Sequence, residues 1–277
     1  VLLSELRAEF FSILSDEQDT LAKALSQIQL KTGQKFIIII DEWDHLIREE
    51  SVPLTVRRCY IDFLSGLFKG TGPSKYIELA YLTGILPIIK IRMESALNNF
   101  TEFTMLGAGP LAPYIGFTEE EVEELCFTHN ISFSDVKRWY DGYRLNGLHL
   151  YNPRAVAQLV TMRQFQSYWT QTGTFRTIRP YIDMNFVGLK DCILTMLAGE
   201  SVSVSVNQFQ NDLENFSSRD DVLTLLIHLG YLSYNAENQT VAIPNEEIRE
   251  EFRLAVAVSN PWQDVQSVLK KSSQMLE

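Results

Sequence analysis

The stretch KFIIIIDEWD, residues 35–44, joins a run of apolar residues directly to three acids. A continuous β-branched run of this length predicts a strand buried on both faces of a parallel sheet. Ligands of parallel α/β sheets bind beyond the carboxyl ends of the strands, which is where these acids follow. The sequence therefore predicts a buried parallel strand with polar groups at its end.

The segments around this strand have the alternation of an α/β sheet. Residues 2–30 repeat apolar side chains at helical spacing, with a polar break at 15–19, and Gly33 is placed to end the helix. Residues 54–69 form a second amphipathic pattern, and residues 77–89 are another apolar run. Strand, helix and strand in this order predict an α/β core.

The pattern changes after residue 110, where two prolines mark a linker. Thr118 and Glu121 have the spacing of a capping box and predict a helix that runs toward Asn130. The elements expected after it are a helix at 134–140, a strand at 148–151, a helix from Pro153, a helix at 188–197, a strand at 202–206, a helix at 220–229 and a hairpin of residues 231–234 and 240–243.

A helix followed by a hairpin resembles a winged helix. We therefore expect four parts: an α/β core at 1–112, a mostly helical lid at 113–180, a winged-helix-like domain at 181–258 and a tail at 259–277.

Composition limits the classes of function. The formal net charge of −11 argues against broad, non-specific binding of nucleic acid or of an anionic membrane. The sequence has no apolar run of the ~18 residues that a membrane helix needs. Three separated cysteines and four histidines show no metal-ligand spacing, and this cysteine usage fits a cytoplasmic protein. With neither an initial Met nor a signal peptide, the chain is expected to begin inside a longer gene product.

The acids after the first strand suggest Mg²⁺ chemistry of the kind found in P-loop NTPases. Asp41 would hold Mg²⁺, and Glu42 would orient and deprotonate a water molecule. The alternative remains open that these acids only cap the following helix. Trp43 is expected to be a packing residue and His45 a surface residue, while Asp44 would cap the helix or support a ligand.

The second apolar run adds two candidates. Thr83 is a polar residue in a buried run, and it fits a sensor that contacts the γ-phosphate and positions water; a Thr bonded only to backbone is the alternative. Arg92 follows the same run and could face phosphate or solvent. No phosphate-binding loop of the form GxxxxGK followed by Ser or Thr occurs, and GTGPSK at 70–75 lacks its spacing. The chain is therefore not expected to build a standard ATP site alone.

Several strings occur together in one order. They are FIIIIDEWD (36–44), AYLTGILPI (80–88), ESALNNF (94–100), GFTEEEVEELC (116–126), RWYDGY (138–143) and YNP (151–153). In this order they resemble the AAA-ATPase-like family that is common in bacteria. The resemblance implies a P-loop ATPase core with its phosphate loop upstream, ATP and Mg²⁺ as ligands, Asp41 and Glu42 as the Mg²⁺ and water pair, and Thr83 as the sensor. Arg92 lies where the family pattern usually has no Arg.

Two alternative functions are compatible with these sequence features. In the first, the parent protein hydrolyses ATP and moves its attached modules, with a protein partner or self-association. In the second, the fold persists as a non-catalytic scaffold for protein or nucleic acid, and the charge disfavours nucleic acid. The sequence upstream of Val1 would distinguish them, because an intact phosphate loop favours the ATPase.

Overall fold

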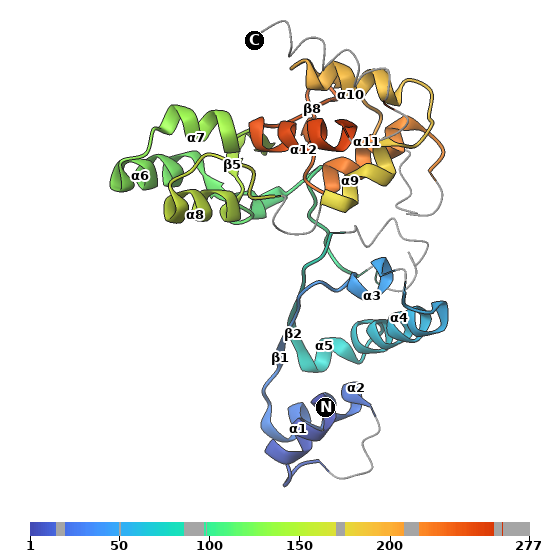
Figure 1. Ribbon diagram of the computed structural model, residues 1–277. Helices are drawn as coiled ribbons and strands as arrows, with labels where there is room; N and C mark the ends of the chain where they lie inside the picture. Colours follow the sequence, from blue (N-terminus) through green and yellow to red (C-terminus); the bar gives the residue numbers. More distant parts are fainter. Residues whose placement is uncertain are drawn as a thin grey trace, which may run out of the picture. The chain divides into compact units, whose positions relative to one another are not determined.

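The computed structural model describes residues 1–14, 20–49, 51–85, 97, 99–169, 175–207, 216–257 and 262. The chain has a mixed α/β fold and divides into two compact units, Val1–Glu102 and Phe103–Glu277. Figure 1 labels most of the helices and some of the strands. Within the described residues, none of the helices combines the length and apolarity that crossing a membrane requires.

The first unit contains a small parallel sheet and short helices. Its elements are α1 (Leu2–Glu9), α2 (Leu21–Thr32), β1 (Phe36–Ile40), α3 (His45–Arg48), α4 (Leu54–Phe68), α5 (Pro73–Tyr76) and β2 (Ile77–Leu82). The helix predicted at 2–30 is therefore two helices, and the polar break between them lies outside the described residues. Gly33 ends α2 in the left-handed conformation, with φ 73°, as predicted.

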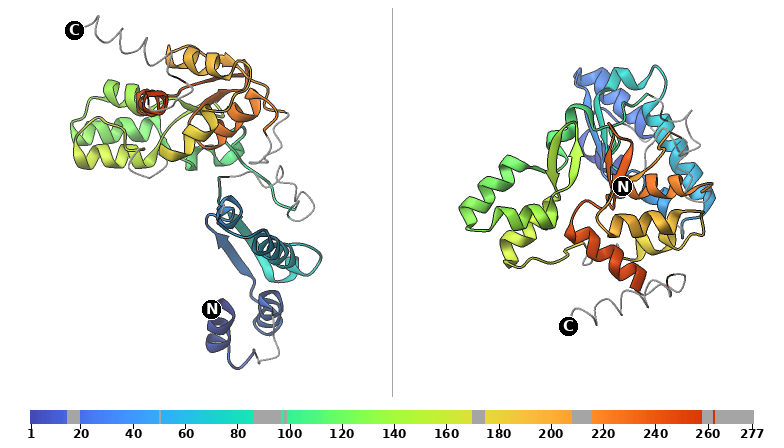
Figure 2. Two further views of the ribbon diagram at one scale, coloured as in Figure 1. Left: turned by 45° about the vertical axis from the view of Figure 1, so that its right-hand side comes forward. Right: turned by 90° about the horizontal axis from the view of Figure 1, so that it is seen from above.

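Strands β1 and β2 pair in parallel, with Ile38 opposite Ala80 and Ile40 opposite Leu82. The parallel sheet is thus confirmed, but the prediction that β1 is buried on both faces is wrong within the described residues. Ile37 and Ile39 are 64% and 70% exposed. Alternate side chains of a strand point to opposite faces, and only the face that carries Ile38 packs against a helical core. Helices α4 and α5 lie on that side (Figures 1 and 2).

The second unit has many short elements. They are η1 (Gly109–Tyr114), β3 (Phe117–Thr118), α6 (Glu119–His129), α7 (Phe133–Tyr140), β4 (Tyr143–Leu145), β5 (Leu148–Tyr151), α8 (Pro153–Met162), α9 (Phe175–Ile182), α10 (Leu189–Leu197), β6 (Val202–Ser203), α11 (Arg219–His228), β7 (Ser233–Asn235), β8 (Thr240–Ala242) and α12 (Glu246–Ala257). Thr118 and Glu121 form the predicted capping box of α6. The strand expected at 202–206 is shorter, since it ends at Ser203.

Two antiparallel sheets organise this unit, with strand orders β3-β5-β4 and β6-β8-β7. Helices α6, α7 and α8 share one apolar cluster with Tyr151, and helices α9 to α12 surround another that is centred on residues such as Ile193 and Phe252. The division at 180 and 181 stays a prediction, and so does the boundary at 112. Apart from Trp262, the tail at 259–277 lies outside the described residues.

Candidate functional site

The carboxyl ends of β1 and β2 bring Asp41, Glu42 and Thr83 together. The backbone segments that directly follow the two strands continue to pair with each other. The Thr83 amide donates to the Ile40 carbonyl at 2.9 Å, and the Trp43 amide donates to the Thr83 carbonyl at 2.9 Å. Parallel pairing therefore holds Thr83 beside the two acids, although 41 residues separate it from Glu42 in sequence.

Glu42 takes an unusual backbone conformation at this point. Its φ is +49°, a left-handed value that is uncommon for residues other than Gly. The conformation directs the Glu42 amide toward Asp41 Oδ1 at 3.0 Å and Thr83 Oγ1 at 3.2 Å. The Thr83 hydroxyl in turn donates to Asp41 Oδ1. A closed ring of hydrogen bonds thus fixes the Asp41 carboxylate.

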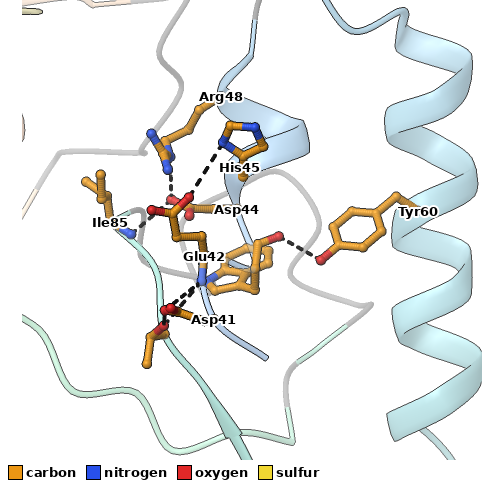
Figure 3. A network of polar contacts seen from close by, with 9 residues as sticks. Asp41, Glu42, Asp44, His45, Arg48, Tyr60 and Ile85 are labelled. Carbon is orange, nitrogen blue, oxygen red and sulfur yellow. Dashed lines mark hydrogen bonds and ion pairs between the residues drawn. The ribbon is translucent and has the colours of Figure 1, made fainter. Parts of the chain in front are cut away.

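The Glu42 side chain extends away from Asp41. Its Oε2 lies 3.7 Å from Nδ1 of His45, one turn further along the chain (Figure 3). Both side chains are more than half exposed, so the pair contributes little to stability. The two carboxylates are therefore accessible and point in different directions. The expectation that His45 is a surface residue is confirmed.

Asp44 links the backbone segments that follow the two strands. Its side chain is fully buried, and Oδ2 accepts from the Ile85 amide at 3.0 Å and from Arg48 Nε at 2.9 Å. Asp44 occupies the N-cap position of α3, but its side chain makes no capping bond there. The helix-cap alternative for Asp44 is therefore wrong. The carboxylate instead fastens the turn after β2 to α3 (Figure 3).

Trp43 is a packing residue, as expected. It is 3% exposed, and its carbonyl accepts from the Tyr60 hydroxyl on α4 at 2.8 Å. Burial raises the pKa of Tyr60, and the Asp44 charge adds to this effect. The hydroxyl therefore stays protonated and keeps its bond to the strand end.

Gly84 is required where the turn passes over Trp43. A Cβ at this position would lie 2.6 Å from the Trp43 ring and 2.9 Å from Asp44 Oδ1. We expect Gly84→Ala to displace Thr83 and lower the free energy of unfolding by about 2 kcal/mol. Urea denaturation would measure this loss, and Gly66→Ala on α4 is a control because its Cβ would meet open space. Equal stability of the two variants would contradict this packing.

The sequence placed Asp41 and Glu42 at the end of the first strand, where the structure has them. It placed Thr83 in the middle of the second run, but β2 ends at Leu82 and Thr83 lies just beyond it. Arg92 lies outside the described residues. The buried links through Asp44 and Gly84 were missed. The available signals were an acid directly after a buried aromatic residue and a glycine directly after the polar Thr.

The donor set suits a hard cation. Within the described residues, the strand ends present three oxygen donors, which are the exposed Asp41 and Glu42 carboxylates and the half-buried Thr83 hydroxyl. Mg²⁺ prefers such ligands and keeps several water molecules of its own. The arrangement can thus hold a hydrated cation at Asp41 and present a free carboxylate at Glu42.

Part of the chain is similar to known proteins. Residues 3–93 match the family described as predicted AAA-ATPase. A protein of Azotobacter chroococcum mcd 1, titled "Uncharacterized protein in vnfD 5'region", is 26% identical over 153 residues, which are 54% of this chain and 29% of that protein. The chain thus matches less than a third of the length of this curated relative. No solved structure matches the chain.

Proposed function

We propose, from the match of residues 3–93 to the family of predicted AAA-ATPases, that the first unit is part of an ATP-hydrolysing core. The observation that carries the proposal is the ring of hydrogen bonds among Asp41, Glu42 and Thr83 at the paired strand ends. Ligands of parallel α/β sheets bind at this edge. The phosphate loop would come from a segment outside residues 1–277.

In this proposal each polar side chain has one role. Asp41 is oriented by the Thr83 hydroxyl and the Glu42 amide, so its free oxygen can hold a hydrated Mg²⁺. Mg²⁺, when bound with ATP, neutralises charge that develops on the phosphates. Glu42 accepts a proton from the attacking water as a general base. Thr83 contacts the water or the γ-phosphate once its hydroxyl turns away from Asp41.

Replacing Glu42 by Gln tests the assignment. In the full-length gene product we expect Glu42→Gln to lower the rate of Mg²⁺-dependent ATP hydrolysis at least ~100-fold, because a general base typically contributes 10²–10⁴-fold. ATP binding should stay within about twofold, since the amide keeps the size of the side chain and Asp41 is unchanged. Phosphate release and binding of a fluorescent ATP analogue would measure the two quantities.

Glu49→Gln is the matched control, because Glu49 is an exposed acid on the same segment, and its carboxylate accepts a hydrogen bond from the Ser51 hydroxyl at 3.1 Å. Hydrolysis at the wild-type rate in Glu49→Gln and its loss in Glu42→Gln would support the proposal. Undiminished hydrolysis in Glu42→Gln would exclude Glu42 as the base. A wild-type protein that binds no ATP would favour the non-catalytic scaffold.

We further propose that residues 181–258 are a winged-helix-like module. Helix α11 leads directly into the hairpin of β7 and β8, and β6 pairs with β8 as a third strand. The hairpin loop, residues 236–239, is Ala-Glu-Asn-Gln and carries no basic residue. This charge favours contact with protein over contact with nucleic acid, which needs cations against its phosphates.

A further inference from the structure

Four polar side chains converge in the second unit, far from Asp41 in sequence. Glu119 is the first residue of α6, and Asp141 directly follows α7. His149 and Tyr151 lie on β5, where a spacing of two residues puts them on the same face of the strand. Antiparallel pairing sets Thr118 opposite Leu150, which brings Glu119 to that part of β5.

The spacing of three of these groups matches the ligand shell of a small cation. His149 Nδ1 lies 3.1 Å from both Asp141 oxygens and 3.6 Å from Glu119 Oε2. One ligand atom from each residue lies within 4.8 Å of the others. Ligands about 2.1 Å from a tetrahedral zinc ion are separated from each other by about 3.4 Å. An ion could therefore enter without movement of the backbone.

Tyr151 provides an independent observation. The residue is 1% exposed, and its hydroxyl faces Glu119 but makes no well-formed hydrogen bond within the described part of the chain. A buried hydroxyl without a well-formed hydrogen bond is unfavourable and calls for an explanation. Water on a bound ion would accept its proton.

Hydrogen bonds from neighbouring groups fix the orientation of the Asp141 and Glu119 carboxylates. The Gly142 amide donates to Asp141 Oδ1 at 2.6 Å, which fixes the orientation of that side chain. Lys137 Nζ donates to both oxygens of Glu119 at 3.0 and 3.1 Å, which fixes the orientation of that carboxylate as well. The Lys137 side chain is 44% exposed and can turn into solvent when a cation replaces its charge.

We propose that Glu119, Asp141 and His149 bind one divalent transition-metal ion of the zinc class, with the Tyr151 hydroxyl bonded to a water on that ion. The imidazole favours Zn²⁺ over Mg²⁺ and Ca²⁺, which prefer oxygen ligands only. Side-chain exposures of 32% for Glu119 and 28% for His149 leave a route for entry. The bound ion fastens α6 and the end of α7 to β5.

Calorimetric titration of the metal-free chain with Zn²⁺ tests the site. The wild type should bind one Zn²⁺ and gain thermal stability. His149→Gln should weaken binding at least ~30-fold, and Tyr151→Phe should weaken it ~10-fold without changing the stoichiometry. His45→Gln is the matched control, because His45 also lies beside a carboxylate but in the other unit, and it should bind as the wild type does.

Asp141→Asn is a second ligand variant that keeps an oxygen for the Gly142 amide, so a folded protein is expected, as circular dichroism would verify. Loss of Zn²⁺ affinity in His149→Gln and Asp141→Asn, but not in His45→Gln, supports the site. Equal affinity of His149→Gln and the wild type overturns it, as does a wild type that binds no stoichiometric Zn²⁺. The four groups would then be an ion-pair network without a metal.

Discussion

Gly142→Ala is expected to lower the free energy of unfolding of the second unit by about 4 kcal/mol, enough to unfold a marginal domain. A Cβ at this position would lie 2.1 Å from the Pro244 carbonyl oxygen, 2.6 Å from its carbon and 2.8 Å from its Cα. These are backbone atoms, and the next residue, Asn245, accepts the Ile248 amide at the start of α12, so the segment cannot easily yield. The φ of +118° adds strain for any residue with a side chain.

Gly147→Ala separates the clash from the backbone strain. Gly147 also has a positive φ, of 79°, but a Cβ there would meet open space. We expect a loss of only about 1 kcal/mol. Urea denaturation followed by the fluorescence of Trp139 and Trp169 would compare the two variants. If both lost the same stability, close packing of Gly142 on Pro244 would not be the cause.

The sequence was most informative where local pattern and pairing agree. An apolar run followed by acids predicted β1 and its polar end, and a second run with a central Thr predicted the neighbour that contacts it. Both outcomes depend on residues close to each strand end. The left-handed conformation of Glu42 directs its amide to Thr83, 41 residues away, so no local pattern contained this contact.

The sequence also led to a wrong prediction for the faces of β1 and contained no sign of the cluster at His149, because both depend on residues distant in sequence. Burial on both faces of β1 was inferred from β-branched composition, but composition cannot say how many layers cover a sheet. His149 showed no ligand spacing because its partners, Glu119 and Asp141, come from two other elements. Clusters that are assembled from three elements leave no periodic signal in the sequence, whereas the capping box at Thr118, which is entirely local, was predicted correctly.

Glu247 should make the stability of the second unit depend on pH in the direction opposite to that of a salt-bridged acid. It is 1% exposed on α12, and its Oε1 accepts from the Tyr168 amide at 2.8 Å. Burial raises its pKa to about 7, with the charges of Glu251 and Glu250 adding to the effect. Since the folded pKa exceeds the unfolded value, the native state binds the proton more tightly. The part of the unfolding free energy that protonated Glu247 contributes is therefore fully present below pH ~4.5 and is lost as pH rises through about 7.

Glu247→Gln removes this titration and keeps an oxygen for the Tyr168 amide. Relative to the wild type, the variant should gain about 2 kcal/mol of unfolding free energy between pH 5 and pH 8, since one pKa unit corresponds to ~1.4 kcal/mol. Glu250 and Glu251 also have raised pKa values and remain in both proteins, so the comparison isolates Glu247. Urea denaturation at the two pH values would measure the gain.

Glu124→Gln on α6 is the control, because Glu124 is exposed and its replacement should change stability equally at both pH values. The Gln amide must also find a partner in the buried site, which lowers the stability of Glu247→Gln by a similar amount at each pH. The pH-dependent difference therefore reports the carboxylate alone. If Glu247→Gln and the wild type changed in parallel from pH 5 to pH 8, Glu247 would be ionised in both the folded and the unfolded protein. The contact of α12 with Tyr168 would then be an ordinary charged hydrogen bond.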